Sequence, residues 1–213
     1  MTAINPGPET HQRGDAYWFL ASLFAARPEG EALARLLALA EQTPAQDDSA
    51  AGEILAALHD IGDRSALELR LATEHTRLFR GVREGYGPPP PYESLWREGQ
   101  LMGDSTVAVA EAYLEAGYGH DESWGPLDHI VEELRFMAAL CHAEDEAWRA
   151  NRADEAEWAR ERQLDFLDRH LLVWMPGYCR ALEEQAHEPL YQALARATAV
   201  VLEQDADSLR RNN

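Results

Sequence analysis

Apolar residues recur every three or four positions along most of the chain, with polar residues between them. The first such stripe contains Tyr17, Leu20, Ala21 and Phe24, and Pro28 should end its helix. Comparable stripes run through residues 29–42, 49–62, 63–81, 105–118, 126–148, 153–174 and 189–202. Alternation of the β type never lasts longer than a few residues. The pattern therefore predicts a chain that is helical almost throughout.

Capping and breaking residues set the expected helix ends. Asp63 or Ser65 can cap the helix that follows them, and Gly81 lies just past its end. Pro176 and Gly177 should interrupt the helical pattern before residue 178. Within residues 105–118, we expect one face to be buried, and its apolar members are Val107, Ala110, Tyr113 and Leu114.

The absence of a 34-residue repeat in the sequence disfavours a tetratricopeptide solenoid. The predicted fold class is therefore all-α. We expect a single compact, bundle-like domain over residues 1–213, with roughly eight to ten helices and a proline-rich loop in the middle.

The charge of the chain narrows the classes of partner. The 38 acidic residues outnumber the 19 basic residues, which gives a formal net charge of −19. This acidity disfavours binding to nucleic acid or to an anionic membrane surface. No apolar run approaches the roughly 20 residues of a membrane span, and residues 1–15 do not resemble a signal peptide, so we expect a cytoplasmic protein.

Two residue counts exclude particular chemistries. All the basic residues are arginines, so a Walker A lysine and a Schiff-base lysine are both excluded. The two cysteines, Cys141 and Cys179, form no C-x-x-C pattern, and we expect them to be buried thiols.

A run of four prolines, Pro88–Pro91, opens the segment "PPPPYESLW". Such a run adopts polyproline II and cannot join a helix. Its aromatic flanks favour docking onto the domain over a linker, whereas display to a proline-reading partner stays an alternative. Tyr92 and Trp96 could equally pack in the core or contact a ligand.

A second non-helical stretch leads into "WGPLDHIVEELRFM", residues 124–137. Pro126 suits the first helical position, which would place Asp128 and His129 in the first turn near the positive end of the helix dipole. His129 with Glu132 or Glu133 could alternatively bind a metal in a helical enzyme. No zincin, zinc-finger or paired di-iron pattern supports that alternative.

Together these segments resemble the TorD/DmsD family of redox-enzyme maturation chaperones. The matching motifs are Leu78–Gly81, Pro90–Ser94, Pro126–Met137 and His170–Pro176, and the resemblance covers about residues 72–203. It implies a non-enzymatic, cytoplasmic, all-helical chaperone without a bound metal or cofactor. The implied partners are the apo catalytic subunit of a molybdopterin-containing oxidoreductase and its twin-arginine signal peptide, bound before export. A monomer and a homodimer are both compatible with it.

The resemblance and the side-chain chemistry together predict a binding site for the client and its signal peptide. Its members are Pro90, Pro91, Tyr92, Glu93, Ser94, Trp96, Trp124, Asp128, His129 and Glu132. Carboxylates suit the two guanidinium groups of such a leader, and aromatic residues suit its apolar segment. We also expect charge reversal of Asp128 to weaken client binding without unfolding the protein.

Overall fold

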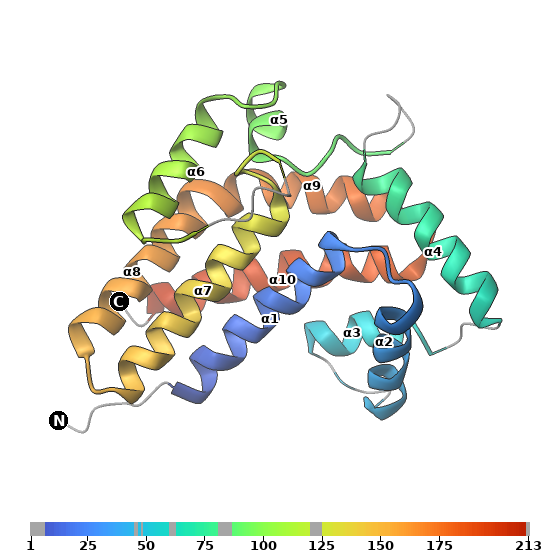
Figure 1. Cartoon of the computed structure of the whole chain (residues 1–213), viewed down its shortest axis with the longest axis horizontal. Coiled ribbons are helices and arrows are strands. Elements are labelled where there is room, and N and C mark those ends of the chain that lie inside the picture. Colours follow the sequence, from blue (N-terminus) through green and yellow to red (C-terminus); the bar gives the residue numbers. More distant parts are fainter. Residues whose placement is uncertain are drawn as a thin grey trace. The chain divides into compact units, whose positions relative to one another are not determined.

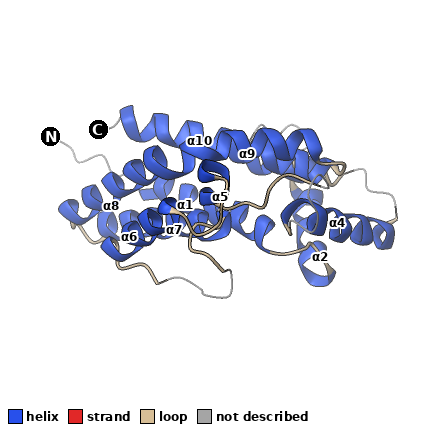
Figure 2. Cartoon of the chain, turned by 90° about the horizontal axis from the view of Figure 1, so that it is seen from above, coloured by secondary structure: helices blue, strands red, loops and turns tan. Residues whose placement is uncertain are grey.

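The computed structural model describes residues 7–44, 47, 49–59, 63–80, 87–119 and 125–211 (Figure 1). Its elements in chain order are α1 (Gly7–Ala25), α2 (Gly30–Gln42), α3 (Ala50–Ala56), α4 (Arg64–Phe79), α5 (Glu93–Glu98), α6 (Asp104–Glu115), α7 (Ile130–Arg149), α8 (Ala153–Phe166), the π-helix η2 (Leu167–Leu171), α9 (Leu172–Gln185) and α10 (Pro189–Arg211). These ranges contain no β-strand, as Figure 2 shows, and the all-α prediction is confirmed. No helix within them is both long and apolar enough to span a membrane.

The chain forms two compact units. The first contains residues up to Ser22, Tyr92–Trp174 and the chain from Leu202 onward. The second contains Leu23–Pro91 and Met175–Val201. The expectation of a single domain over residues 1–213 stays a prediction.

Helix α7 provides much of the core of the first unit. Ile130, Leu134, Met137 and Cys141 recur along one face and are fully buried, as their spacing predicts. Helix α8 packs beside α7 after a tight turn in which Asn151 has a φ of 56°. The ring of Phe136 lies 4.7 Å from that of Tyr113 and 4.8 Å from that of Phe166, which brings α6 onto the same core.

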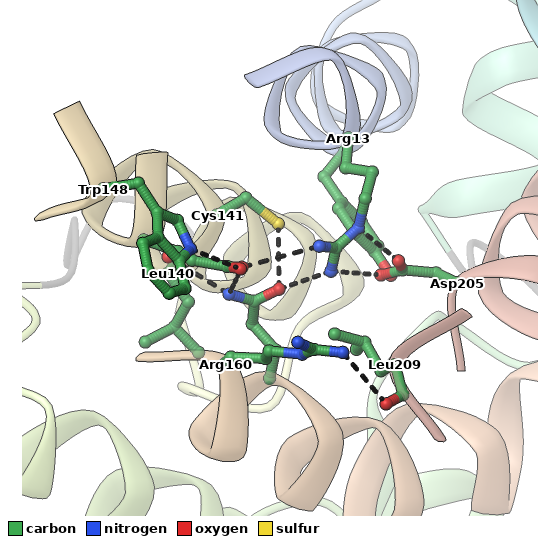
Figure 3. Close-up of polar contacts among 10 residues, drawn as sticks. Arg13, Leu140, Cys141, Trp148, Arg160, Asp205 and Leu209 are labelled. Atoms are coloured by element: carbon green, nitrogen blue, oxygen red, sulfur yellow. Dashed lines mark hydrogen bonds and ion pairs between the residues drawn. The ribbon is translucent and has the colours of Figure 1, made fainter. Parts of the chain in front are cut away.

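A buried polar network joins α1, α7, α8 and α10 within this unit (Figure 3). The Arg13 guanidinium pairs with Asp205 and also donates to Gln163, and Tyr17 donates to Asp205 at 2.7 Å. The thiol of Cys141 lies 3.4 Å from Gln163 Oε1, and burial raises the pKa of this thiol well above that of an exposed cysteine. Both Cys141 and Cys179 are free and buried, as expected.

The second unit has its own aromatic core. Phe79 on α4 packs edge-on against Phe24 and Tyr191, with ring centroids 5.5 Å apart in each pair. The buried ring of His75 packs 4.7 Å from Phe79. Asp63 caps α4 by accepting a hydrogen bond from the Ser65 N–H at 3.0 Å, which confirms one of the two predicted caps. Gly81 lies outside the described residues.

The expected core face of α6 is correct at Tyr113, which is buried, and wrong at Val107 and Leu114. Val107 is 58% exposed and Leu114 is 81% exposed, whereas Val109, which was not expected in the core, is buried. Because apolar residues occur on several sides of this helix, more than one stripe fits the helical period. Tyr113 packs against Phe136 of α7, and Val109, about one turn before it, lies on the same buried side of α6.

The expected break at Pro176 is also wrong, because Pro176 lies inside α9. A proline ring normally clashes with the carbonyl four residues earlier, which here belongs to Leu172. The π-helix η2 ends at this point, and Leu172 has a ψ of −13° where a regular helix has about −42°. This local change tilts the Leu172 carbonyl and makes room for the ring.

Candidate functional site

The proline segment docks onto the protein. A Cβ atom added to Gly87 would lie 2.4 Å from the Arg77 carbonyl oxygen at the end of α4, so only glycine fits there. Pro88 and Pro91 are buried, Pro90 is half-buried and Pro89 is exposed. The two prolines of the P-x-x-P pattern are therefore not available to a proline-reading partner, and the adaptor alternative is wrong for this conformation.

Helix α5 begins where the prolines end, and a residue far along the chain caps it. The carboxylate of Asp128 accepts a hydrogen bond from the Ser94 N–H at 2.8 Å, and its carbonyl oxygen accepts one from the Glu93 N–H at 2.9 Å. Tyr92, the N-cap of α5, makes no capping hydrogen bond with its own side chain. Asp128 thus supplies the acceptors that the first N–H groups of α5 require.

This arrangement corrects the predicted place of Asp128 and His129. Helix α7 begins at Ile130, so neither residue lies in its first turn. His129 is the N-cap, and its Nδ1 accepts a hydrogen bond from the Val131 N–H at 3.2 Å. Asp128 turns away to α5. A local pattern cannot reveal this choice, because the partner of Asp128 is 34 residues distant in sequence.

Tyr92 and His129 lie directly opposite each other. They form an isolated antiparallel β-bridge, and their rings meet edge to face with centroids 4.8 Å apart. The two motif segments are therefore joined through both backbone and side chains. Tyr92 stays half-buried, whereas His129 is 9% exposed.

Beneath this junction lies a buried group of carboxyl side chains: Glu93, Asp128 and Glu133. Glu93 pairs with Arg97, and its other oxygen lies 2.9 Å from His170 Nδ1. Glu133 Oε2 accepts a hydrogen bond from the Trp174 indole N–H at 3.1 Å. Burial, followed by the neighbouring Glu93 carboxylate, raises the pKa of Glu133 well above that of an ordinary glutamate.

Two residues that contact this group, His170 and Trp174, are not among the site residues predicted from the sequence. A signal for them was present, because both are fixed positions of the segment His170–Pro176 that carries part of the family resemblance. The structure brings that segment to the other two: His170 contacts Glu93, and Trp174 contacts Glu133. Three separate motifs thus meet at one place.

The remaining predicted site residues differ in accessibility. Ser94 is fully buried, and Glu132 is 2% exposed and pairs with Arg135 at 3.0 Å. Trp96 is half-buried, as is its neighbour Leu95, whereas Trp124 lies outside the described residues. Because Asp128 is fully buried, charge reversal there would place an arginine or lysine in the core. The expectation that such a variant stays folded is therefore withdrawn. Client binding by these residues stays a prediction.

The metal alternative finds no support in the described ranges, which contain no group of three or more His, Cys, Asp or Glu side chains arranged to hold an ion. Its proposed carboxylate ligands are engaged elsewhere. Glu132 pairs with Arg135, and Glu133 accepts from Trp174.

Comparison with known proteins places the fold and motifs in one family. Residues 40–180 match the model of the nitrate reductase delta subunit family. The chaperone protein TorD of Vibrio cholerae is 27% identical over 207 residues, covering 93% of this chain and 92% of the relative. The selenate reductase assembly chaperone of Thauera selenatis is 32% identical over 184 residues, covering 86% of this chain and 82% of the relative.

A solved structure supports the same assignment. The crystal structure of a candidate redox enzyme maturation protein from Archaeoglobus fulgidus superimposes with a TM-score of 0.55 at 26% identity, covering 90% of this chain and 93% of that chain. Because the family match covers well over half of the sequence, this chain belongs to the TorD and nitrate reductase delta subunit family of redox-enzyme maturation chaperones.

Proposed function

We propose that this protein is a cytoplasmic, system-specific chaperone for the catalytic subunit of a molybdopterin-containing oxidoreductase. It binds the apo subunit and its twin-arginine signal peptide and holds back export until the cofactor is inserted. The proposal rests on family membership and on one structural observation. Three of the four motif segments that carry the resemblance, Pro90–Ser94, Pro126–Met137 and His170–Pro176, converge on the junction of Tyr92 with His129.

The junction supports binding more than catalysis. Its carboxyl groups are buried and are engaged with backbone N–H groups, Arg97, His170 and Trp174, whereas Tyr92, Leu95 and Trp96 are half-exposed beside them. In this proposal the buried groups fix the backbone, and the half-exposed aromatic and aliphatic surfaces contact the client. The protein acts by binding and has no catalytic step of its own.

The charge of the chain supports a client that carries arginines. A net charge of −19 attracts a twin-arginine leader over long range, and this attraction weakens as salt is added. Carboxylates that are already paired within the protein do not need to open for such steering.

Affinity purification of the tagged protein from its native cytoplasm, followed by mass spectrometry, tests the proposal. We expect recovery of the catalytic subunit of a molybdopterin oxidoreductase, with less recovered by a Tyr92→Ala variant. A Leu69→Ser variant is a suitable control, because Leu69 is 70% exposed on α4 and belongs to none of the motif segments. If the wild-type protein repeatedly recovers no such subunit, the proposal is wrong.

A further inference from the structure

Helix α6 belongs to the first unit (Figure 1). One side of this helix carries apolar residues that are exposed to solvent. Val107 is 58% exposed and Leu114, seven residues later, is 81% exposed. Ala110, which is half-buried, lies between them on the same side of the helix. With 100° between successive residues, these three side chains fall within about 60° of one another around the helix axis.

An acidic stripe runs beside the apolar one. Asp104, Glu111 and Glu115 are all exposed, and their spacing places them within about 40° of one another. Glu115 pairs with Arg162 at 3.0 Å. Among the residues that the structure describes, Asp104 and Glu111 have no basic partner. Two of the three carboxylates are therefore available for a cation supplied by another molecule.

Neither stripe is needed to hold α6 in place. The opposite side of the helix provides its packing through Val109, which is fully buried, and Tyr113, which is 2% exposed. Tyr113 also donates a hydrogen bond to the Leu127 carbonyl oxygen at 3.2 Å. Exposed apolar side chains grouped on one helical face, next to unpaired charge, are typical of a binding surface.

We propose that this face of α6, defined by Val107, Ala110 and Leu114 with Asp104, Glu111 and Glu115, binds an amphipathic helix in the mature region of the client. The helix has an apolar stripe and, beside it, a stripe of arginine or lysine. The inference rests on the proposed function and adds a second contact to it. Because α6 has 12 residues, the contact extends over about 18 Å, or three helical turns.

The arrangement of the two stripes favours the mature region over the signal peptide. In a twin-arginine leader, the arginines and the apolar segment follow one another along the chain. On α6 the acidic and apolar stripes lie side by side over the whole length of the helix. A partner that satisfies both stripes must carry its charges beside its apolar residues, as an amphipathic helix does.

A matched pair of variants tests this surface. The stripe variant is Val107→Ser with Leu114→Ser, and the control is Val200→Ser with Leu69→Ser. Val200 is 41% exposed and Leu69 is 70% exposed, and neither belongs to a motif segment, so both variants exchange one exposed valine and one exposed leucine. The probe is the apo catalytic subunit recovered by the native purification, produced without its signal peptide. Thermal melting first establishes that both variants are folded.

We expect the stripe variant to bind the leaderless subunit about tenfold more weakly than the control does, since a central apolar contact is lost. A variant with Asp104→Asn and Glu111→Gln should bind more weakly at low salt and show a smaller loss of affinity when salt is added. Binding of a synthetic twin-arginine leader peptide should be the same for the stripe variant and the control.

Three results would overturn the inference. The first is equal affinity of the stripe variant and the control for the leaderless subunit. The second is a loss of affinity confined to the leader peptide, which would make the leader the occupant. The third is a wild-type dimer that the stripe substitutions dissociate in sedimentation, which would make the occupant a second copy. If the wild-type chain binds no molybdoenzyme subunit, the proposed function fails as well, so the two failures are distinguishable.

Discussion

The ring of Tyr92 packs edge to face against the ring of His129 at a centroid distance of 4.8 Å. This contact joins the two motif segments at the only β-bridge in the described parts of the chain. We expect Tyr92→Ala to weaken client binding several-fold and to lower the free energy of unfolding by about 1 kcal/mol. Tyr92→Phe keeps the ring and should bind nearly as the wild type does. Titration with the client subunit measures the affinity of both variants, and urea denaturation measures the change in stability. Wild-type affinity in the alanine variant would contradict the proposed contact.

Asp128 variants separate charge from hydrogen bonding. The buried carboxylate accepts from the Ser94 N–H, so Asp128→Ala should lower the free energy of unfolding by about 2 kcal/mol. Asp128→Asn keeps an acceptor oxygen and should lose clearly less. Urea denaturation measures the difference. Equal losses in the two variants would mean that the hydrogen bond to Ser94 contributes little to stability.

Glu133 should make stability depend on pH. Its raised pKa means that the folded protein keeps the proton while the unfolded chain, with an ordinary glutamate pKa near 4.3, releases it. The unfolding free energy contributed by this group is fully present below that value and decreases as pH rises toward the raised pKa.

Glu133→Gln removes this dependence and keeps an oxygen for the Trp174 indole N–H. The melting temperature of the variant, relative to the wild type, should therefore increase between pH 5 and pH 8. Glu132→Gln is the neighbouring control, since Glu132 pairs with Arg135. A constant difference across this range would show that Glu133 is ionised in the folded protein.

His75 should make the unfolding free energy depend on pH in the opposite sense to Glu133. Burial lowers the pKa of His75 to about 4 from an ordinary value of 6.5. The stability that it contributes is fully present above pH 6.5 and is lost as pH falls through the folded pKa, by up to about 3 kcal/mol. His75→Leu should flatten the decline of unfolding free energy between pH 6.5 and pH 4 in denaturant titrations.

Helix type and most helix positions could be predicted from the sequence because apolar residues recur at the helical period, most clearly in α7 and α10. Ile130, Leu134 and Met137 illustrate this, since they lie on the apolar stripe predicted over residues 126–148 and are fully buried. The cap at Asp63 could also be predicted, because its acceptor lies two residues from the N–H group that it binds.

Other features depend on contacts that local patterns do not encode. The buried side of α6 is chosen by Phe136, and the widened turn at η2 lets Pro176 stay in a helix. The proline segment was expected to lie near Asp128 and His129, but the contacts that join them were not predicted. Asp128 caps α5, and His170 and Trp174 contact the buried carboxyl groups of Glu93 and Glu133.

Helix α5 contains only six residues, too few to persist in water without support. Its first N–H groups depend on Asp128, so the helix can order only after the start of α7 has reached its place. The Ser94 amide hydrogen therefore reports on the integrity of the whole junction. Its exchange with deuterium will be slow while the segments stay together and fast whenever a client, or the protein itself, separates them.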